Sequence, residues 1–208
     1  MPSGIIVIDK PSDWTSMDVC AKLRGRFHEK RVGHGGTLDP MATGVLPVFL
    51  GRATRAVTFA SESEKEYQFG LKLGVVTNTQ DITGQVVEQT PLTGTAEDLL
   101  SVLPRFRGDI RQVPPMYSAI KIGGKKLYEL ARAGQVIERE PRPVTIHGIT
   151  IQSVELPRVT FDVSCSKGTY IRSLCRDIGE KLGCGAVMEK LVRTEVKGFT
   201  IEESLTLD

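Results

Sequence analysis

Residues 33–44 of this 208-residue chain read GHGGTLDPMATG. Three glycines fall within four positions, and Asp39 stands directly before a proline. Because glycine supplies positive φ and Asp-Pro readily opens a loop, these residue types alone favour an ordinary turn. Whether Asp39 also carries chemistry depends on what the rest of the chain places around it.

The composition is that of an ordinary globular protein, with 40% hydrophobic and 25% charged residues. A formal net charge of +2 does not by itself indicate a nucleic-acid partner, but the basic residues are clustered. Residues 21–31 hold five basic side chains against one glutamate, and Lys121, Lys125 and Lys126 surround a Gly-Gly pair. Such clusters are either solvated faces or sites for a polyanion.

Other classes of protein find little support. The four cysteines form no Cys-x-x-Cys pair and histidines are few, so we expect reduced thiols and no metal site. We expect no signal peptide at the N-terminus, and no stretch of the sequence is long and apolar enough to span a membrane.

Hydrophobic periodicity predicts an α+β fold with a mixed, mainly antiparallel sheet flanked by helices and loops. Strands are expected at residues 4–9, 45–50, 65–73, 84–89, 117–122, 145–155, 159–166 and 186–196. Helices are expected after Thr15, after Thr95, at 127–133, at 169–182 and after Thr200. No linker divides the chain, so residues 1–208 are expected to form one domain.

A lone nucleophilic carboxylate must stay ionised and be aimed, and a neighbouring arginine can do both. No second acidic residue lies near Asp39 in sequence, so a paired-carboxylate hydrolase is not supported locally. Arg172, in the stretch SKGTYIRSL, is the candidate partner, although a surface arginine is an equally good interpretation. His34, flanked by glycines, is expected to be exposed, whereas Tyr67 and Leu191 are expected in the core.

The stretch RVGHGGTLDPMATGVLPV resembles the signature of the TruB family of bacterial tRNA pseudouridine synthases. The similarity continues collinearly through DKPSDWTS, KEYQFGLKLG, DITG, QVPPMYSAIKIGGKKLYELARAG, KGTYIRSLCRDIG and LVRTEVKGF. It covers essentially the whole chain, and the combination of motifs is highly specific.

The resemblance implies the pseudouridine synthase fold and the isomerisation of uridine to pseudouridine at position 55, in the T loop of tRNA, by base flipping. Asp39 would then be the nucleophile and Arg172 its ion-pair partner. Tyr67 would lie against the flipped uracil and assist proton abstraction, with Tyr170 and Leu191 lining the pocket. His34 would occupy the space that the flipped base leaves, or stack on the extruded nucleotide. Lys10, Arg31, Lys121, Lys125 and Lys126 would contact the RNA backbone.

Further expectations follow from the resemblance: no metal or cofactor, no guide RNA, no membrane, a monomer and a cytoplasmic location. Asp13 stands where the family usually has glycine, and aspartate tolerates the left-handed region. The chain ends at Asp208, so we expect the C-terminal PUA-type RNA-binding domain usual in the family to be absent, which would weaken tRNA affinity.

Three alternatives remain at this stage. The chain could be an RNA chaperone of the same fold in which modification is secondary. It could be a guide-RNA-dependent relative, or a glycoside hydrolase that uses Asp39 with a second carboxylate.

Overall fold

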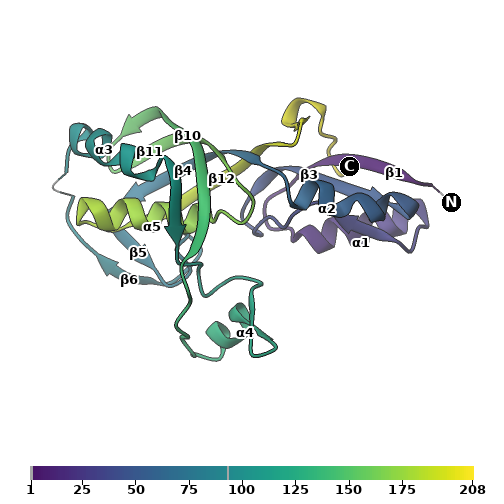
Figure 1. Ribbon diagram of the computed structural model, residues 1–208, viewed down its shortest axis with the longest axis horizontal. Helices are drawn as coiled ribbons and strands as arrows, with labels where there is room; N and C mark the ends of the chain where they lie inside the picture. The colour runs from purple at the N-terminus through teal and green to yellow at the C-terminus, as the bar shows by residue number, and fades with distance from the viewer. Residues whose placement is uncertain (1, 93) are drawn as a thin grey trace. The chain divides into compact units, whose positions relative to one another are not determined.

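The structure is a computed structural model that describes residues 2–92 and 94–208, and the chain divides into two compact units. Unit 1 runs to Gln68 and also contains Asp162–Lys167 and Lys190–Asp208. Unit 2 contains Phe69–Phe161 and Gly168–Glu189. Each unit therefore combines segments that are far apart in the sequence (Figure 1).

The main sheet confirms the predicted α+β class and its mainly antiparallel character. Its strand order is β1 (Gly4–Lys10), β3 (Thr43–Leu50), β12 (Ala186–Val196), β4 (Lys65–Leu73), β11 (Arg158–Cys165), β10 (Arg142–Glu155) and β7 (Gly108–Gln112). β1 pairs antiparallel with β3 and β10 with β7, whereas β12 runs parallel to β3. Three strands, β4, β11 and β12, contribute residues to both units.

Four short strand pairings complete the description. β2 (Val32–His34) pairs with β3, and β13 (Phe199–Thr200) pairs with β12. β5 (Val75–Thr77) pairs with β6 (Val86–Gln89), and β8 (Lys121–Ile122) with β9 (Lys125–Lys126). The Gly-Gly pair between the lysines forms the turn between β8 and β9, where Gly123 and Gly124 have φ of 59° and 82°. Two successive positive φ angles suit a two-residue hairpin turn.

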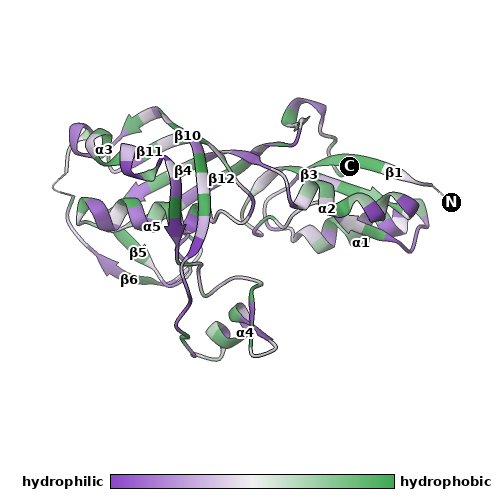
Figure 2. Cartoon of the chain, in the orientation of Figure 1, coloured by the Kyte–Doolittle hydropathy of each residue, from purple (hydrophilic) through white to green (hydrophobic). Residues whose placement is uncertain are grey.

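In unit 1, β3 is buried on both faces. Its residues Leu46 and Val48 join a cluster with α1 (Ser16–Phe27), while Val45 and Phe49 join a cluster that includes Ala60 of α2 (Val57–Ser61). Alternate residues of a strand point to opposite faces, so the two helices cover opposite sides of β3. The neighbouring strand β1 is coloured mostly as hydrophobic in Figure 2.

Helix α1 begins where the sequence predicts. The Thr15 side chain accepts a hydrogen bond from the Asp18 amide, and the Asp18 carboxylate accepts one from the Thr15 amide at 2.8 Å. This reciprocal capping box satisfies main-chain N–H groups that have no partner inside the helix. It also fixes the segment that leads from β1 into the helix.

Unit 2 contains α5 (Ile171–Leu182), the helix predicted at 169–182, which buries its apolar side chains. These side chains are those of Ile171, Leu174, Cys175 and Ile178. Gly183 ends the helix with a φ of 74°, as its position predicts. Helix α3 (Ala96–Val102) begins at the predicted Thr95 capping box and continues into the short helix η2 (Leu103–Phe106).

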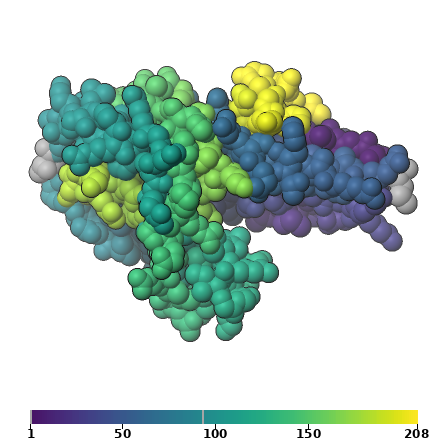
Figure 3. Space-filling model, viewed as in Figure 1, coloured from purple at the N-terminus to yellow at the C-terminus, as the bar shows by residue number. Residues whose placement is uncertain are grey.

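Helix α4 (Leu127–Arg132) has a small apolar cluster of its own. Its residues Leu127 and Leu130 pack with Met116 and with partly buried neighbours, including Ile137. Figures 1 and 3 show this segment as a lobe that projects from the rest of unit 2. The lobe carries the β8–β9 hairpin, so it presents the basic cluster of the sequence on a projecting element.

Several local predictions are wrong. The glycine stretch was expected to form a turn, but its first two residues belong to β2, Val32–His34. Strand β3 contains Pro47, and a proline usually marks an edge strand or a bulge. Yet Val7 of β1 pairs with Pro47 on one side, and on the other side the Pro47 carbonyl accepts from the Gly35 amide at 2.8 Å. The last helix is only a short 3-10 turn, η3 (Ile201–Glu203), closed by the Thr200 capping box.

Candidate active site

Asp39 lies in a firmly held turn in unit 1. The Ala42 amide donates to the Asp39 carbonyl at 3.0 Å, which closes the expected Asp-Pro turn. The next carbonyl, that of Pro40, accepts from the Asp13 amide at 2.8 Å and from Lys10 Nζ at 3.1 Å. Asp39 itself is half-buried. Its main chain is thus fixed by the segment between β1 and α1.

Asp13 makes one of these contacts from the left-handed region, with a φ of 65°. This confirms that aspartate adopts at this position the conformation that a glycine would take easily. Its amide reaches the Pro40 carbonyl, so the substitution leaves the link between the two loops in place.

Glycine is required at the two positions 35 and 36, before Asp39, for two different physical reasons. A Cβ at Gly35 would stand 2.5 Å from the Ala60 Cβ and 3.2 Å from a ring carbon of Phe49. Gly36 has a φ of 117°, which L side chains rarely adopt. Gly35 is therefore needed for packing against the protein itself, and Gly36 for the bend that leads to Thr37 and Asp39.

The position of Lys10 contradicts the prediction made for it. It was expected to contact the RNA backbone, but its side chain is fully buried. Its Nζ donates to the carbonyls of Pro11 at 2.9 Å, Trp14 at 2.6 Å and Pro40 at 3.1 Å. Burial lowers the pKa of Lys10 to about 8, and the charge of Asp39 opposes that shift. Lys10 holds two loops of the protein together.

Tyr67 and Leu191 are buried, as predicted, and a residue that the sequence analysis missed lies with them. Arg193 of β12 is fully buried, and its guanidinium lies close enough to the Tyr67 hydroxyl to interact with it. Burial raises the pKa of Tyr67, and the positive charge of Arg193 opposes the rise. Asp39 is close enough to raise it further. Asp39, Tyr67 and Arg193 therefore belong to one electrostatic neighbourhood of unit 1.

The signal for Arg193 was present in the sequence. It stands two residues after Leu191 in LVRTEV, so both side chains point to the same face of the strand. An arginine on the buried face of a strand must have its charge and its donors compensated. A core position at Leu191 therefore predicts that Arg193 is buried as well, among partners for its donors.

His34 is half-buried, which corrects the expectation of an exposed side chain. It ends β2 and pairs with Val48 of β3, so the flanking glycines do not leave it free of the fold. Burial lowers its pKa, as does the charge of Arg193, and the nearby Gly36 main chain partly offsets both effects. A neutral imidazole is therefore the dominant form near pH 7.

In unit 2, Arg172 is buried rather than a surface arginine. Its Nη1 donates to the Thr79 carbonyl at 3.2 Å and its Nη2 to the Tyr117 carbonyl at 2.9 Å. The Thr79 turn is itself held by Asp81, whose Oδ1 accepts from Thr79 Oγ1 at 2.9 Å and from the Thr83 amide at 3.0 Å. The expected pairing of Arg172 with Asp39 stays a prediction.

Tyr170 directly precedes α5 and is half-buried. The side-chain amide of Gln112 clamps its main chain, accepting from the Tyr170 amide at 3.0 Å and donating to its carbonyl at 3.3 Å. This clamp fixes the entry to the helix that carries Arg172. The predicted role of Tyr170 in binding the base remains a prediction.

The remaining basic candidates lie at the surface. Arg31, Lys121 and Lys125 are exposed, and Lys126 is half-buried beside Tyr128, with its Nζ 5.3 Å from the ring centre. They are thus accessible to a phosphate backbone, in contrast to Lys10.

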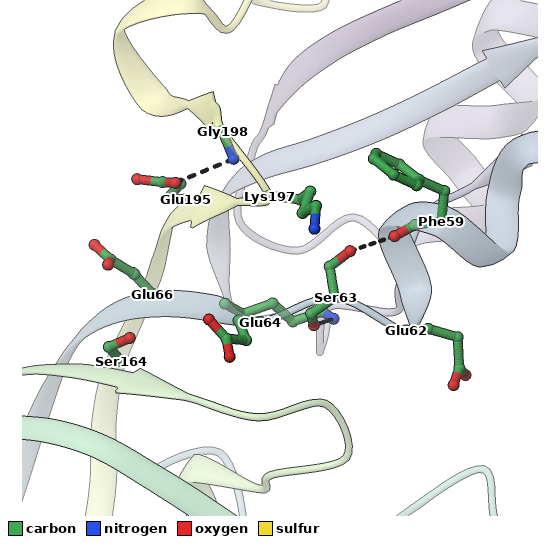
Figure 4. A pocket seen from close by; sticks show the side chains of 10 residues that line it. Phe59, Glu62, Ser63, Glu64, Glu66, Ser164, Glu195, Lys197 and Gly198 are labelled. Atoms are coloured by element: carbon green, nitrogen blue, oxygen red, sulfur yellow. Dashed lines mark hydrogen bonds between the residues drawn. The ribbon is translucent and has the colours of Figure 1, made fainter.

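A hollow of about 820 Å³ lies elsewhere in unit 1 (Figure 4). Four carboxylates line it, together with Lys65 and Lys197: those of Glu62, Glu64, Glu66 and Glu195. None of the predicted site residues lines it. Because excess negative charge repels phosphate, this hollow is a poor candidate for an RNA-binding pocket.

Within residues 2–92 and 94–208, no group of three or more His, Cys, Asp or Glu residues is arranged to hold a metal ion. No helix in the same part of the chain is long and apolar enough to cross a membrane.

Comparison with known families decides the relationship. Residues 24–171 match the family model described as the TruB family pseudouridylate synthase N-terminal domain. The chain belongs to the TruB family. Residues 172–208 match the model of the tRNA pseudouridylate synthase B C-terminal domain. The boundary between the two matches falls inside α5, and the expectation of a single domain over residues 1–208 stays a prediction.

Curated relatives cover nearly the whole chain. A tRNA pseudouridine synthase B of Alkaliphilus oremlandii is 49% identical over 206 residues, which are 99% of this chain and 69% of the relative. A protein of the same name from Clostridium kluyveri is 49% identical over 205 residues, 99% of this chain and 71% of the relative. These names support an enzyme that forms pseudouridine in tRNA.

Solved structures agree on the fold. A chain in a Cbf5-Nop10-Gar1 complex superimposes with a TM-score of 0.78 at 34% identity, and the match covers 98% of this chain. A chain in an H/ACA RNP bound to a substrate RNA gives a TM-score of 0.74 at 31% identity. This TruB-family chain spans about half the length of those two chains.

Proposed function

We propose that this chain converts uridine 55 in the T loop of tRNA to pseudouridine, with Asp39 as the nucleophile. The observation that carries the proposal is the match to the TruB family across residues 24–208, which includes Asp39 on its anchored turn. The curated relatives that act on tRNA are 49% identical, so tRNA is the substrate we favour. We propose a cytoplasmic monomer that needs no guide RNA, metal or cofactor.

The reaction breaks the bond between N1 of uracil and C1′ of the ribose and forms one between C5 and C1′. The C5 proton is lost and N1 gains a proton, so the change is an isomerisation without net oxidation. Asp39 either takes up C1′ as the glycosidic bond breaks or attacks the uracil ring. Both routes need an ionised carboxylate held in a fixed direction. The turn at Pro40 fixes the main chain that carries this carboxylate.

The other residues take supporting roles in this proposal. The target uridine is stacked inside folded RNA and must be flipped out, at a cost of a few kcal/mol. Neutral His34 stacks on the extruded nucleotide or fills the space that it leaves. Tyr67 lies against the uracil and assists removal of the C5 proton, and Leu191 and Tyr170 line the pocket. Arg172 keeps the role of ion-pair partner that the family resemblance implies.

RNA contacts are assigned to exposed cations only. Arg31 in unit 1 and the β8–β9 lysines in unit 2 are accessible, so we propose that they contact backbone phosphates. A stem-loop is recognised by its shape and its phosphates, without a helix in the major groove.

An unmodified full-length tRNA transcript tests the proposed position. After incubation with the protein alone, pseudouridine is mapped by chemical adducts that stop reverse transcription. We expect one new stop, at position 55, and none in a transcript with cytidine at that position. Stops only at other uridines would contradict the T-loop assignment. Binding and refolding of tRNA without any new stop would favour the RNA-chaperone alternative.

A further inference from the structure

Arg193, the fully buried arginine of unit 1, is not among the residues that take part in the proposed reaction. Arg193 has no exposed surface, although burying a guanidinium is costly unless its donors are bonded. Its place in the fold is specified: it pairs with Gly44 of β3, where a Cβ would stand 2.2 Å from the Arg193 carbonyl. Glycine at position 44 lets β12 come close enough to put Arg193 beneath the Asp39 loop.

The guanidinium joins three segments of unit 1. Nε donates to the Val45 carbonyl of β3 at 2.8 Å. Nη2 and Nη1 donate to the carbonyls of Gly36 at 3.0 Å and Thr37 at 3.5 Å, in the loop just before Asp39. The guanidinium also interacts with the Tyr67 hydroxyl on β4. One planar group with donors in fixed directions therefore ties Tyr67 to the loop that carries Asp39.

The positive charge acts on the same neighbourhood. Main-chain carbonyls accept hydrogen bonds from all three nitrogens of the Arg193 guanidinium, but they carry no net charge to neutralise it. The charge favours the ionised form of Tyr67 against burial, and it disfavours protonation of His34 and Lys65. An arginine that only filled space in the core would be replaceable by an apolar side chain; this one also sets the electrostatics around Tyr67.

We propose that Arg193 is a positioning residue for the isomerisation, which fixes the Tyr67 hydroxyl relative to the Gly36–Thr37 loop and hence to Asp39. The inference rests on the proposed function. Lysine cannot replace it, because a single ammonium cannot hold the β3 carbonyl, the loop carbonyls and the Tyr67 hydroxyl in one plane. The role is distinct from that of Lys10, which fastens the far side of the same turn through the Pro40 carbonyl.

A double-mutant cycle tests the link to Tyr67. Single-turnover rates on a saturating T-arm minihelix are measured for Arg193→Lys, Arg193→Gln, Tyr67→Phe and the double variant Arg193→Lys/Tyr67→Phe. We expect each Arg193 variant to lose about 100-fold in rate while the minihelix dissociation constant changes less than about threefold. The double variant should be no slower than the slower of the two single variants, because each single substitution already removes the interaction between Arg193 and Tyr67.

The control is Arg107→Lys, which alters an arginine that donates to one main-chain carbonyl in unit 2, that of Ile149 at 3.0 Å. Its rate should match the unaltered protein. Losses that multiply in the double variant, or an Arg193→Lys rate equal to that of the control, would overturn the inference. An inactive unaltered protein would instead overturn the proposed function.

If the Arg193 variants do not fold, arginine side-chain NMR provides an independent measurement. In the unaltered protein, a buried guanidinium should give slowly exchanging N–H signals. Tyr67→Phe, which removes only the hydroxyl, should shift one of these signals. Tyr128→Phe, which alters an arginine-contacting ring in α4, should leave that signal in place. No shift in Tyr67→Phe would mean that the hydroxyl does not hold Arg193, and the inference would fail.

Discussion

The cations around the Asp39 loop and the cations of the β8–β9 hairpin are chemically alike but lie in opposite environments. Lys10 and Arg193 are fully buried and donate to main-chain carbonyls of unit 1. Lys121 and Lys125 are exposed on the projecting lobe of unit 2. A buried cation with fixed partners shapes a site, whereas an exposed one is available to a ligand. We therefore assign chemistry to the loop and RNA affinity to the hairpin.

The largest expected effect is that of Asp39→Asn. Asparagine is nearly isosteric and can keep the turn, but it lacks the negative charge and the nucleophilic oxygen. We expect the single-turnover rate to fall by at least about 1,000-fold, or roughly 4 kcal/mol. The minihelix dissociation constant should stay within about tenfold. Adduct mapping and a binding titration on the same preparation measure the two quantities; substantial pseudouridine from the verified variant would remove Asp39 as nucleophile.

Lys10→Met tests whether the buried lysine is structural. The native pKa of about 8 lies below the ordinary 10.5, so between these values the unfolded chain binds more protons. The stability of the unaltered protein relative to Lys10→Met should therefore rise with pH, by about 2 kcal/mol between pH 7 and 9.5. Urea unfolding of both proteins at the two pH values measures it. A stability difference that does not change with pH would mean that Lys10 is not buried as a charged group.

Removal of the β8–β9 hairpin lysines tests whether these exposed cations bind RNA phosphates. In Lys121→Ala/Lys125→Ala/Lys126→Ala, three phosphate contacts would be lost, so the log–log salt slope of duplex binding should fall by up to about 2.7. The rate at saturation should be unchanged. A control variant replaces Lys181, Lys190 and Lys197, which are exposed elsewhere. Equal slopes for the two triple variants would show that the hairpin is only a solvated face.

His34→Ala should have the smallest effect, a loss of about tenfold in single-turnover rate. His34→Phe keeps an aromatic face and should lose less. Because the pKa of His34 lies below its ordinary value, protonation of this side chain should not alter the rate between pH 7 and 8. A loss as complete as that of Asp39→Asn would mean that His34 takes part in bond making.

Local patterns were enough to predict most elements of the fold. The alternation from Lys65 to Leu73 gave β4 with its bounds, and the Thr15 and Thr95 capping boxes gave two helix starts. Local patterns do not predict which strands pair over long range. Nothing near Pro47 in sequence indicates that β1 lies on one side of it and Gly35 on the other. The short β2 was missed for the same reason, because its partner is 14 residues away at Val48.

The same limit applies to the site. The motif around Asp39 and the family resemblance could be taken from the sequence, but the burial of a cation could not. Lys10 and Lys125 are both lysines in motif segments, and only the fold shows that three carbonyls surround one of them. Arg193 was missed because its partners at Gly36 and Val45 are about 150 residues earlier in the chain.

The most direct test of the central claim is tritium release from a T-arm minihelix labelled at C5 of uridine 55. C5 must lose its hydrogen when it joins C1′, so the protein alone, without metal, cofactor or guide RNA, should release about one tritium per minihelix into water. A minihelix labelled only at uridine 54 should release none. Full binding of the labelled RNA with no release from position 55 would contradict the account.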